Sequence, residues 1–202
     1  MTLWRGKYPL ILASQSRTRQ ALLSNAGINF EAVAAEIDER AVQQASGLSA
    51  PGDIAALLAR EKALSVSARL SGKFVIGADQ TLALGERLFS KPAGRAQAAE
   101  QLRALAGRSH ELHSAVAVAC DGKILFERAA IARMTMRRLG EPAIDAYLDE
   151  AGEAVATSVG AYQLEGLGVH LFARIEGDHF TILGLPLLPL LAFLRSERLL
   201  GV

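Results

Sequence analysis

Hydroxyl and guanidinium groups that could bind phosphate follow the first apolar segment of the chain. Residues 10–13 are apolar and an Ala-Leu-Leu run at helical spacing begins soon afterwards; between them lie Ser14, Ser16, Arg17 and Arg19. This pattern predicts a buried strand, a tight turn and a helix. Helix N-termini and guanidinium groups both bind anions, so the turn could hold phosphate. The alternative is that Ser14 or Ser16 only caps the helix and that the arginines are solvated.

A carboxylate follows a second apolar run. Residues 74–78 form a continuous apolar segment, which predicts a strand covered on both faces, and Asp79 comes directly after it. Ligands in open α/β sheets bind at the carboxyl ends of strands. Asp79 could therefore hold magnesium opposite phosphate groups bound by Arg19. The alternative is that Asp79 caps a turn.

Further charged residues could complete such a site. Lys62, on a predicted helix, and Lys91, after a predicted hairpin, could neutralise a polyphosphate in the transition state. The acidic residues Glu36, Asp38 and Glu39 could supply a second metal ligand. The alternatives are ordinary ones, because a lysine on an apolar stripe usually reaches solvent and acidic clusters are usually solvated.

The elements expected around these residues alternate between strands and helices, which favours an α/β fold with a mixed twisted sheet flanked by helices. Apolar runs and turn residues predict strands at 29–35, 81–84, 88–89, 113–119, 124–138 and 169–175. Apolar periodicity predicts helices at 51–70, 96–105, 142–150 and near the C-terminus. Residues 41–50 are small and polar and are expected to form a mobile surface loop.

Composition limits the class of protein. The 202 residues carry a formal net charge of +1, which gives no overall field to attract nucleic acid or a membrane surface. The length fits a single domain over 1–202. The single cysteine, Cys120, is consistent with a cytoplasmic protein. No histidine pair has ligand spacing, since His110 and His113 should point to opposite faces of one strand.

These residues, in this order, resemble the Maf family of nucleoside triphosphate pyrophosphatases. The family's first motif corresponds to Leu-Ala-Ser-Gln-Ser-Arg-Thr-Arg at 12–19. Its later motifs correspond to Asp38-Glu39, Lys62-Ala63, Gly77-Ala78-Asp79, Lys91-Pro92, Gly160-Ala161-Tyr162, Glu165-Gly166 and Gly184-Leu185-Pro186. Each motif alone is weak, but the ordered series is specific and covers nearly the whole chain.

The resemblance implies an elongated, two-lobed fold with a central cleft and a homodimeric assembly. It implies cleavage between the α and β phosphates of a nucleoside triphosphate with the help of a divalent metal, Mg²⁺ or Mn²⁺. By the same resemblance, Asp79 is the catalytic residue, as proton acceptor for the attacking water or as metal ligand. Ser14, Arg19, Lys62 and Lys91 would contact the triphosphate.

Departures from the family pattern concern the phosphate loop and the base. Arg17 stands where the family has proline and Thr18 where it has its first arginine. Gln80 and Glu165 resemble members acting on 7-methyl-GTP, although the Gly-Ala-Tyr at 160–162 resembles the pyrimidine-type members. A carboxylate can accept two hydrogen bonds from the N1 and N2 edge of guanine and favours a cationic methylated ring. Glu165 therefore favours a 7-methyl-GTP-like or broad specificity over dTTP and UTP.

The family's older name suggests a second function, a nucleotide-binding regulator of cell division and septum formation. A pure sensor needs the cations that bind phosphate but has no use for the Asp79 carboxylate. The combination of Asp79 with Lys62 and Lys91 favours an enzyme.

Overall fold

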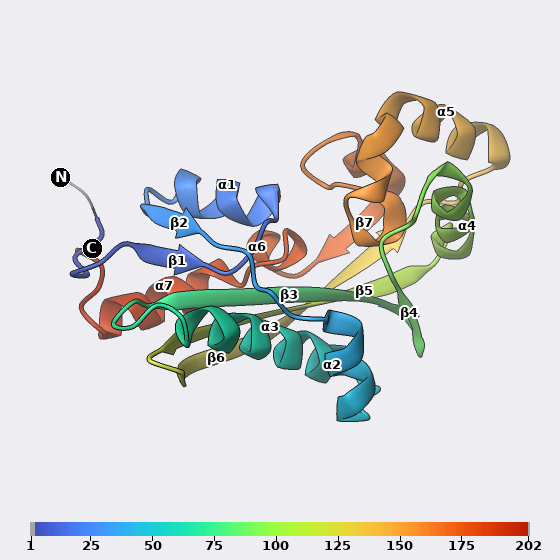
Figure 1. The fold of residues 1–202 in the computed structure, drawn as a ribbon. Coiled ribbons are helices and arrows are strands. Elements are labelled where there is room, and N and C mark those ends of the chain that lie inside the picture. Colours follow the sequence, from blue (N-terminus) through green and yellow to red (C-terminus); the bar gives the residue numbers. More distant parts are fainter. Residues whose placement is uncertain (1–2, 202) are drawn as a thin grey trace. The chain divides into compact units, whose positions relative to one another are not determined.

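A computed structural model describes residues 3–201 and contains a seven-stranded mixed sheet flanked by helices (Figure 1). The strand order is β2-β1-β3-β5-β6-β7, and β4 pairs with β3. The strands are β1 (Leu10–Leu12), β2 (Phe30–Ala32), β3 (Val75–Leu84), β4 (Arg87–Phe89), β5 (Ser109–Cys120), β6 (Lys123–Met136) and β7 (Phe172–Glu176). The helices are α1 (Arg17–Asn25), α2 (Glu39–Ser46), α3 (Pro51–Ser67), α4 (Arg95–Leu105), α5 (Glu141–Ala151), α6 (His179–Ile182) and α7 (Leu187–Ser196), with short 3-10 helices η1 (Gly152–Ala156), η2 (Val159–Ala161) and η3 (Leu167–Leu171). The predicted mixed α/β sheet is confirmed.

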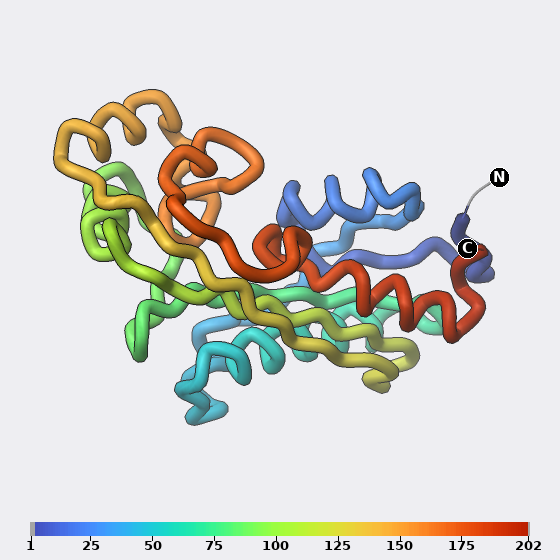
Figure 2. The backbone as a smooth tube through the Cα atoms, turned by 180° about the vertical axis from the view of Figure 1, so that it is seen from behind, coloured from blue at the N-terminus to red at the C-terminus, as the bar shows by residue number. Residues whose placement is uncertain are grey.

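The chain forms two compact units. The first takes in the described residues up to Gln80, the segment His113–Ala130 and the described residues from Asp178 onwards. The second takes in Thr81–Leu112 and Ile131–Gly177. In the first unit, the isolated bridge between Trp4 and Leu200 holds the beginning and end of the described chain side by side, as Figure 2 shows from behind.

Helices cover both faces of the sheet in the first unit (Figure 1). One face packs against α1 and α7 through large apolar side chains, among them Leu10, Leu12, Ile76, Val116, Leu22 and Leu190. The other face packs against α3 through alanines: Ala55, Ala59 and Ala63 on the helix and Ala115, Ala117 and Ala119 on β5. Burial on both faces is the reason that β1 and the start of β3 are continuous apolar runs.

The sequence-based prediction was wrong for residues 41–50. Most of this segment lies in α2, where the Asp38 carboxylate caps the helix by accepting the N–H of Ala41 at 3.0 Å. Gly47, with φ of 66°, ends the helix. Helix α2 has no buried residue. Its apolar residues, Ala41, Val42 and Ala45, are few and mostly small, so the segment resembles a polar loop in the sequence.

Strand β3 also departs from prediction, because it continues past Ala78 to Leu84 and keeps Asp79 within the strand. Strand β7 begins only at Phe172, after the 3-10 helix Leu167–Leu171. The hairpins β3–β4 and β5–β6 and the helices α3, α4, α5 and α7 lie where predicted, with small differences at their ends. None of the helices within residues 3–201 has the length and apolar character needed to cross a membrane.

The second unit contains a buried histidine that must stay neutral. His110 is 1% exposed and its Nε2 lies 2.7 Å from the Tyr162 hydroxyl. Its Nδ1 has no hydrogen-bond partner among the described residues, and the rings of Tyr162 and Phe172 surround it. Burial lowers the pKa of His110 to about 4.

We expect this histidine to make folding pH-dependent. The unfolded chain binds a proton at His110 below about pH 6.5, whereas the folded chain does so only near pH 4. The contribution of neutral His110 to the unfolding free energy is thus complete above pH 6.5 and is lost as the pH falls towards 4. Between pH 7.5 and pH 5, wild type should lose about 2 kcal/mol more unfolding free energy than His110→Gln.

Urea unfolding at the two pH values measures this difference. His179→Gln, which changes an exposed histidine, is the matched control and should follow wild type. If wild type and His110→Gln lost the same unfolding free energy between the two pH values, His110 would not be buried in its neutral form.

Candidate active site

Asp79 lies where strand β3 changes partners. Residues Val75 and Ile76 pair with β1, and Leu82 to Leu84 pair with β4. Neither register includes the residues from Gly77 to Gln80, and Asp79 is one of them. Its side chain is 7% exposed. At this part of the edge, side chains from other elements take the place of a partner strand, as Arg19 does at the Ala78 carbonyl.

A glycine brings helix α3 against this part of β3. A Cβ built on Gly77 would lie 2.1 Å from the Ala59 carbonyl oxygen and 2.6 Å from the Ala63 backbone nitrogen. Only glycine allows the helix backbone to approach the strand so closely. The approach sets Lys62, one residue before Ala63, beside Asp79, two residues after Gly77. The glycine of the Gly-Ala-Asp motif is thus explained by packing.

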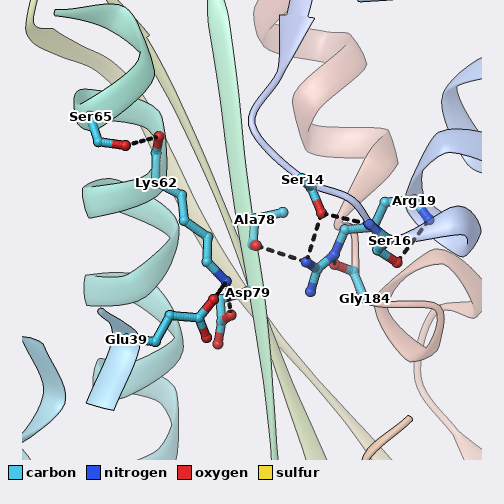
Figure 3. A network of polar contacts seen from close by, with 9 residues as sticks. All are labelled: Ser14, Ser16, Arg19, Glu39, Lys62, Ser65, Ala78, Asp79 and Gly184. Carbon is cyan, nitrogen blue, oxygen red and sulfur yellow. Dashed lines mark hydrogen bonds and ion pairs between the residues drawn. The ribbon is translucent and has the colours of Figure 1, made fainter. Parts of the chain in front are cut away.

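Two carboxylates share the ammonium group of Lys62 (Figure 3). Lys62 Nζ lies 2.6 Å from Asp79 Oδ1 and 2.8 Å from Glu39 Oε1. Lys62 is 8% exposed, so it points into the site and does not extend to solvent. Glu39 comes from the first turn of α2, and its contact with Lys62 ties this exposed helix to α3.

Burial raises the pKa of Asp79, and the positive charges of Lys62 and Arg19 oppose that rise. Burial also lowers the pKa of Arg19, whose ordinary value is so high that the guanidinium stays charged. Two cations therefore face two carboxylates, Asp79 and Glu39, and the group is close to electrically neutral. A carboxylate with a raised pKa is better suited to accept a proton near neutral pH.

The turn after β1 places Ser14 and Arg19 next to the same strand. Ser16 caps α1 by accepting the Arg19 backbone N–H at 3.4 Å, so the capping alternative holds for Ser16. Ser14 does not cap the helix; its hydroxyl accepts from the Ser16 N–H at 3.2 Å and from Arg19 Nη1 at 3.4 Å. Arg19 Nη1 also donates to the Ala78 carbonyl at 2.9 Å, beside Asp79 (Figure 3).

Four side chains predicted for the site are thus brought together in the first unit, namely Ser14, Arg19, Lys62 and Asp79, with Glu39 as a fifth. Arg17 is exposed at the start of α1. Asp38 uses its carboxylate to cap α2. Within residues 3–201, no three or more His, Cys, Asp or Glu side chains are arranged to hold a metal ion.

The two remaining predicted residues, Lys91 and Glu165, belong to the second unit and are exposed. Glu165 lies in a tightly closed loop, because a Cβ on Gly168 would lie 2.3 Å from the Gln163 carbonyl oxygen. The Gln163 amide in turn donates to the Thr157 hydroxyl at 2.7 Å. Contact of Lys91 or Glu165 with a ligand bound at Asp79 stays a prediction.

Sequence reasoning missed three residues that position these groups. Gly184 accepts a hydrogen bond from Arg19 Nε at 2.8 Å, and Gln80 and Ser114 hydrogen-bond with one another at 2.9 Å. The Gly-Leu-Pro motif at 184–186 and the position of Gln80 after Asp79 were weak signals. Ser114 gave no signal, because one serine at the start of an apolar strand is unremarkable in sequence.

Comparisons with known proteins agree on one family. The family model described as "Maf-like protein" matches residues 9–197. A protein named nucleoside triphosphate pyrophosphatase from Bradyrhizobium diazoefficiens is 72% identical over 202 residues, covering 100% of both chains. A protein named 7-methyl-GTP pyrophosphatase from Rhizobium meliloti is 54% identical over 190 residues, covering 93% of this chain and 95% of that protein.

A more distant similarity is found among solved structures. A nucleoside-triphosphatase, or dITP/XTP pyrophosphatase, from Mycobacterium abscessus matches with a TM-score of 0.41 and 17% identity over 95% of this chain and 96% of that one. The family model and the close relatives span the segments that carry Ser14, Arg19, Lys62 and Asp79. The chain belongs to the Maf-like protein family.

Proposed function

We propose that this protein hydrolyses nucleoside triphosphates to the monophosphate and pyrophosphate, with a preference for a 7-methyl-GTP-like base over dTTP and UTP. The observation that carries the proposal is the convergence of Lys62, Asp79 and Glu39 at strand β3, with Arg19 bonded to the same strand. The names of the relatives, nucleoside triphosphate pyrophosphatase and 7-methyl-GTP pyrophosphatase, support the same reaction class.

The proposed reaction forms one bond and breaks one bond at the α-phosphorus. A water oxygen attacks the α-phosphorus, the bond to the oxygen that bridges the α and β phosphates breaks, and pyrophosphate leaves. Asp79 accepts the proton of the attacking water as the general base. Arg19 and Lys62 stabilise the negative charge that develops on the phosphate oxygens.

A divalent metal fits the charges of the site. Arg19 and Lys62 are balanced by Asp79 and Glu39, so the four side chains alone supply no net positive charge for a triphosphate. Magnesium is commonly held by one or two carboxylates together with substrate phosphates. We propose that Asp79 and Glu39 hold Mg²⁺ or Mn²⁺, which neutralises the triphosphate when bound.

The base preference rests on Glu165. Gln80 cannot contribute an amide donor to the base, because its Nε2 already faces the carbonyls of Thr181 and Ile182 at 3.2 and 2.9 Å and the Ser114 hydroxyl at 2.9 Å. Glu165 can accept two hydrogen bonds from a guanine edge and favours a positively charged methylated ring.

The partners follow from the same proposal. We propose a cytoplasmic homodimer that acts on free nucleotides. The net charge of +1 supports free nucleotides over nucleic acid as partners, since long polyanions are bound by strongly basic surfaces. The single cysteine is consistent with a reducing compartment.

A pyrophosphate-release panel tests the function. With Mg²⁺ or Mn²⁺, wild type should release pyrophosphate from 7-methyl-GTP with a higher kcat/KM than from dTTP or UTP. Glu165→Gln should move this ranking towards the pyrimidine nucleotides by roughly tenfold, the discrimination expected from one base-edge contact. Glu150→Gln, an exposed carboxylate on α5, is the control and should leave the ranking unchanged. No release from any nucleotide would contradict the function, and an unchanged ranking would remove Glu165 from base recognition.

A further inference from the structure

Two backbone carbonyls fix the guanidinium group of Arg19. Its Nε donates to the Gly184 carbonyl at 2.8 Å and its Nη1 donates to the Ala78 carbonyl at 2.9 Å. The guanidinium is a rigid plane, so two fixed N–H directions also fix the direction of the remaining N–H groups on Nη2. The binding geometry that Arg19 offers to a phosphate therefore depends on where these two carbonyls lie.

The two carbonyls differ in how firmly they are held. Ala78 belongs to β3 and is held by the sheet. Gly184 belongs to the turn after the four-residue helix α6, and its φ of +86° lies in the region that favours glycine. This turn lies outside the sheet, and both its local hydrogen bonds and its hydrogen bonds to the sheet contribute to its position. Several bonds are local, among them those from the Thr181 N–H to the Asp178 carboxylate at 3.0 Å and from the Gly184 N–H to the Thr181 carbonyl at 3.1 Å.

Ser114 and Gln80 connect this turn to the centre of the sheet. The Ser114 hydroxyl donates to the Thr181 carbonyl at 2.7 Å and accepts from Gln80 Nε2 at 2.9 Å. Gln80 Nε2 also lies 2.9 Å from the Ile182 carbonyl. The side chains of Arg19 and Gln80 both reach Gly184, because a Cβ built there would lie 3.4 Å from Arg19 Nε and 3.6 Å from Gln80 Oε1.

The surroundings of Ser114 show that its hydroxyl serves this turn. Ser114 is fully buried, and the five residues after it, 115–119, are all alanine or valine. A hydroxyl buried in such a place costs free energy unless it is hydrogen-bonded. Alanine would continue the apolar face of β5, so packing alone gives no reason for serine at this position.

We propose that Ser114 is a positioning residue for substrate binding: through Gln80 and the turn 178–184, it holds Arg19 in the orientation that binds the triphosphate. The inference rests on the proposed function, in which Arg19 contacts the phosphates. The Ser114 hydroxyl bonds to Gln80 and to the Thr181 carbonyl, and its effect on Arg19 is therefore indirect. Its loss should act on the binding of nucleotide and leave Lys62, Asp79 and Glu39 in place.

Ser114→Ala should therefore raise KM for the nucleoside triphosphate about tenfold, the effect of weakening one hydrogen bond to a charged group, with kcat within about threefold of wild type. Ser114→Thr keeps the hydroxyl and suits a strand, so it should restore KM. Ser67→Ala is the matched control, because Ser67 is 1% exposed and its hydroxyl accepts the Gly122 N–H at 3.0 Å, away from Arg19.

A double-mutant cycle separates positioning from a general effect on the fold. In an Arg19→Lys background the rigid guanidinium is absent, so adding Ser114→Ala should raise KM by less than twofold. Gln80→Met removes the amide that donates to the Ser114 hydroxyl and to the Ile182 carbonyl, and it leaves β5 unchanged. It should show the same dependence on Arg19, so it tests the proposal even if Ser114→Ala does not fold.

Two outcomes separate this inference from the proposed function. An equal rise of KM in the wild-type and Arg19→Lys backgrounds would overturn the positioning role while leaving the pyrophosphatase intact. The absence of pyrophosphate release from wild type and Ser67→Ala alike would overturn the proposed function, and this inference with it.

Discussion

Asp79→Asn should lower kcat for pyrophosphate release by about 10³-fold, the usual size of a lost general base, while the protein still binds nucleotide. The amide cannot accept the proton of the attacking water and is a poor ligand for a divalent metal. Nucleotide binding should persist because the variant removes a negative charge near the phosphates and leaves Arg19 in place. Lys62 would keep Glu39 as its partner at 2.8 Å, so the local fold should also survive.

Steady-state kinetics and calorimetric titration with a nucleoside triphosphate measure the two parts of this prediction. Asp149→Asn is the matched control, since it makes the same chemical change at an exposed carboxylate whose partner is Arg95 at 2.8 Å. A wild-type rate in Asp79→Asn would show that the proton acceptor is another group. Loss of nucleotide binding together with turnover would assign Asp79 to binding.

Much of the fold could be predicted because its signals are local. The apolar runs at 10–13 and 74–78 indicate strands that are buried on both faces, and β1 and β3 lie there. Helix α2 has no buried residue, and its apolar residues are too few and small to distinguish the segment from a loop. Asp79 was expected after the end of a strand, but Lys62 neutralises its charge and the strand continues through it.

The charged residues of the candidate site could be predicted from the sequence, but the residues that position them could not. Ser14, Arg19, Lys62 and Asp79 each have ordinary structural uses, such as capping or solvation, and stand out only as an ordered series of motifs. The residues that position them are distant in sequence and are brought together by the fold: Gly184 lies 165 residues from Arg19, and Ser114 lies 34 residues from Gln80. A contact between a carbonyl and a distant side chain leaves no signal in residue type or spacing.

Lys62→Met should lower kcat by at least about 100-fold. The same variant should bind Mn²⁺ more tightly than wild type in the absence of nucleotide. In the wild-type protein the Lys62 ammonium lies between Asp79 and Glu39, at 2.6 and 2.8 Å, and occupies both carboxylates that are proposed to hold the metal. A cation placed there must compete with the lysine. Methionine fills a similar volume without charge, and it leaves the buried Asp79 without its partner, an arrangement that destabilises a protein.

A metal ion that replaces the lost charge should therefore stabilise the variant. Mn²⁺ titration followed by the electron paramagnetic resonance of the free ion should give a Kd at least about tenfold lower for Lys62→Met than for wild type, which corresponds to ~1.4 kcal/mol. Thermal unfolding gives a second measure, because a ligand of the folded state raises Tm, and the rise with Mn²⁺ should be larger for the variant.

Lys73→Met, which breaks the 3.5 Å pair with Glu31, is the control and should bind Mn²⁺ as wild type does. Equal Mn²⁺ affinity in wild type and Lys62→Met would mean that Asp79 and Glu39 are not the metal ligands, and the catalytic charge would then have to come from Arg19 and Lys62 alone.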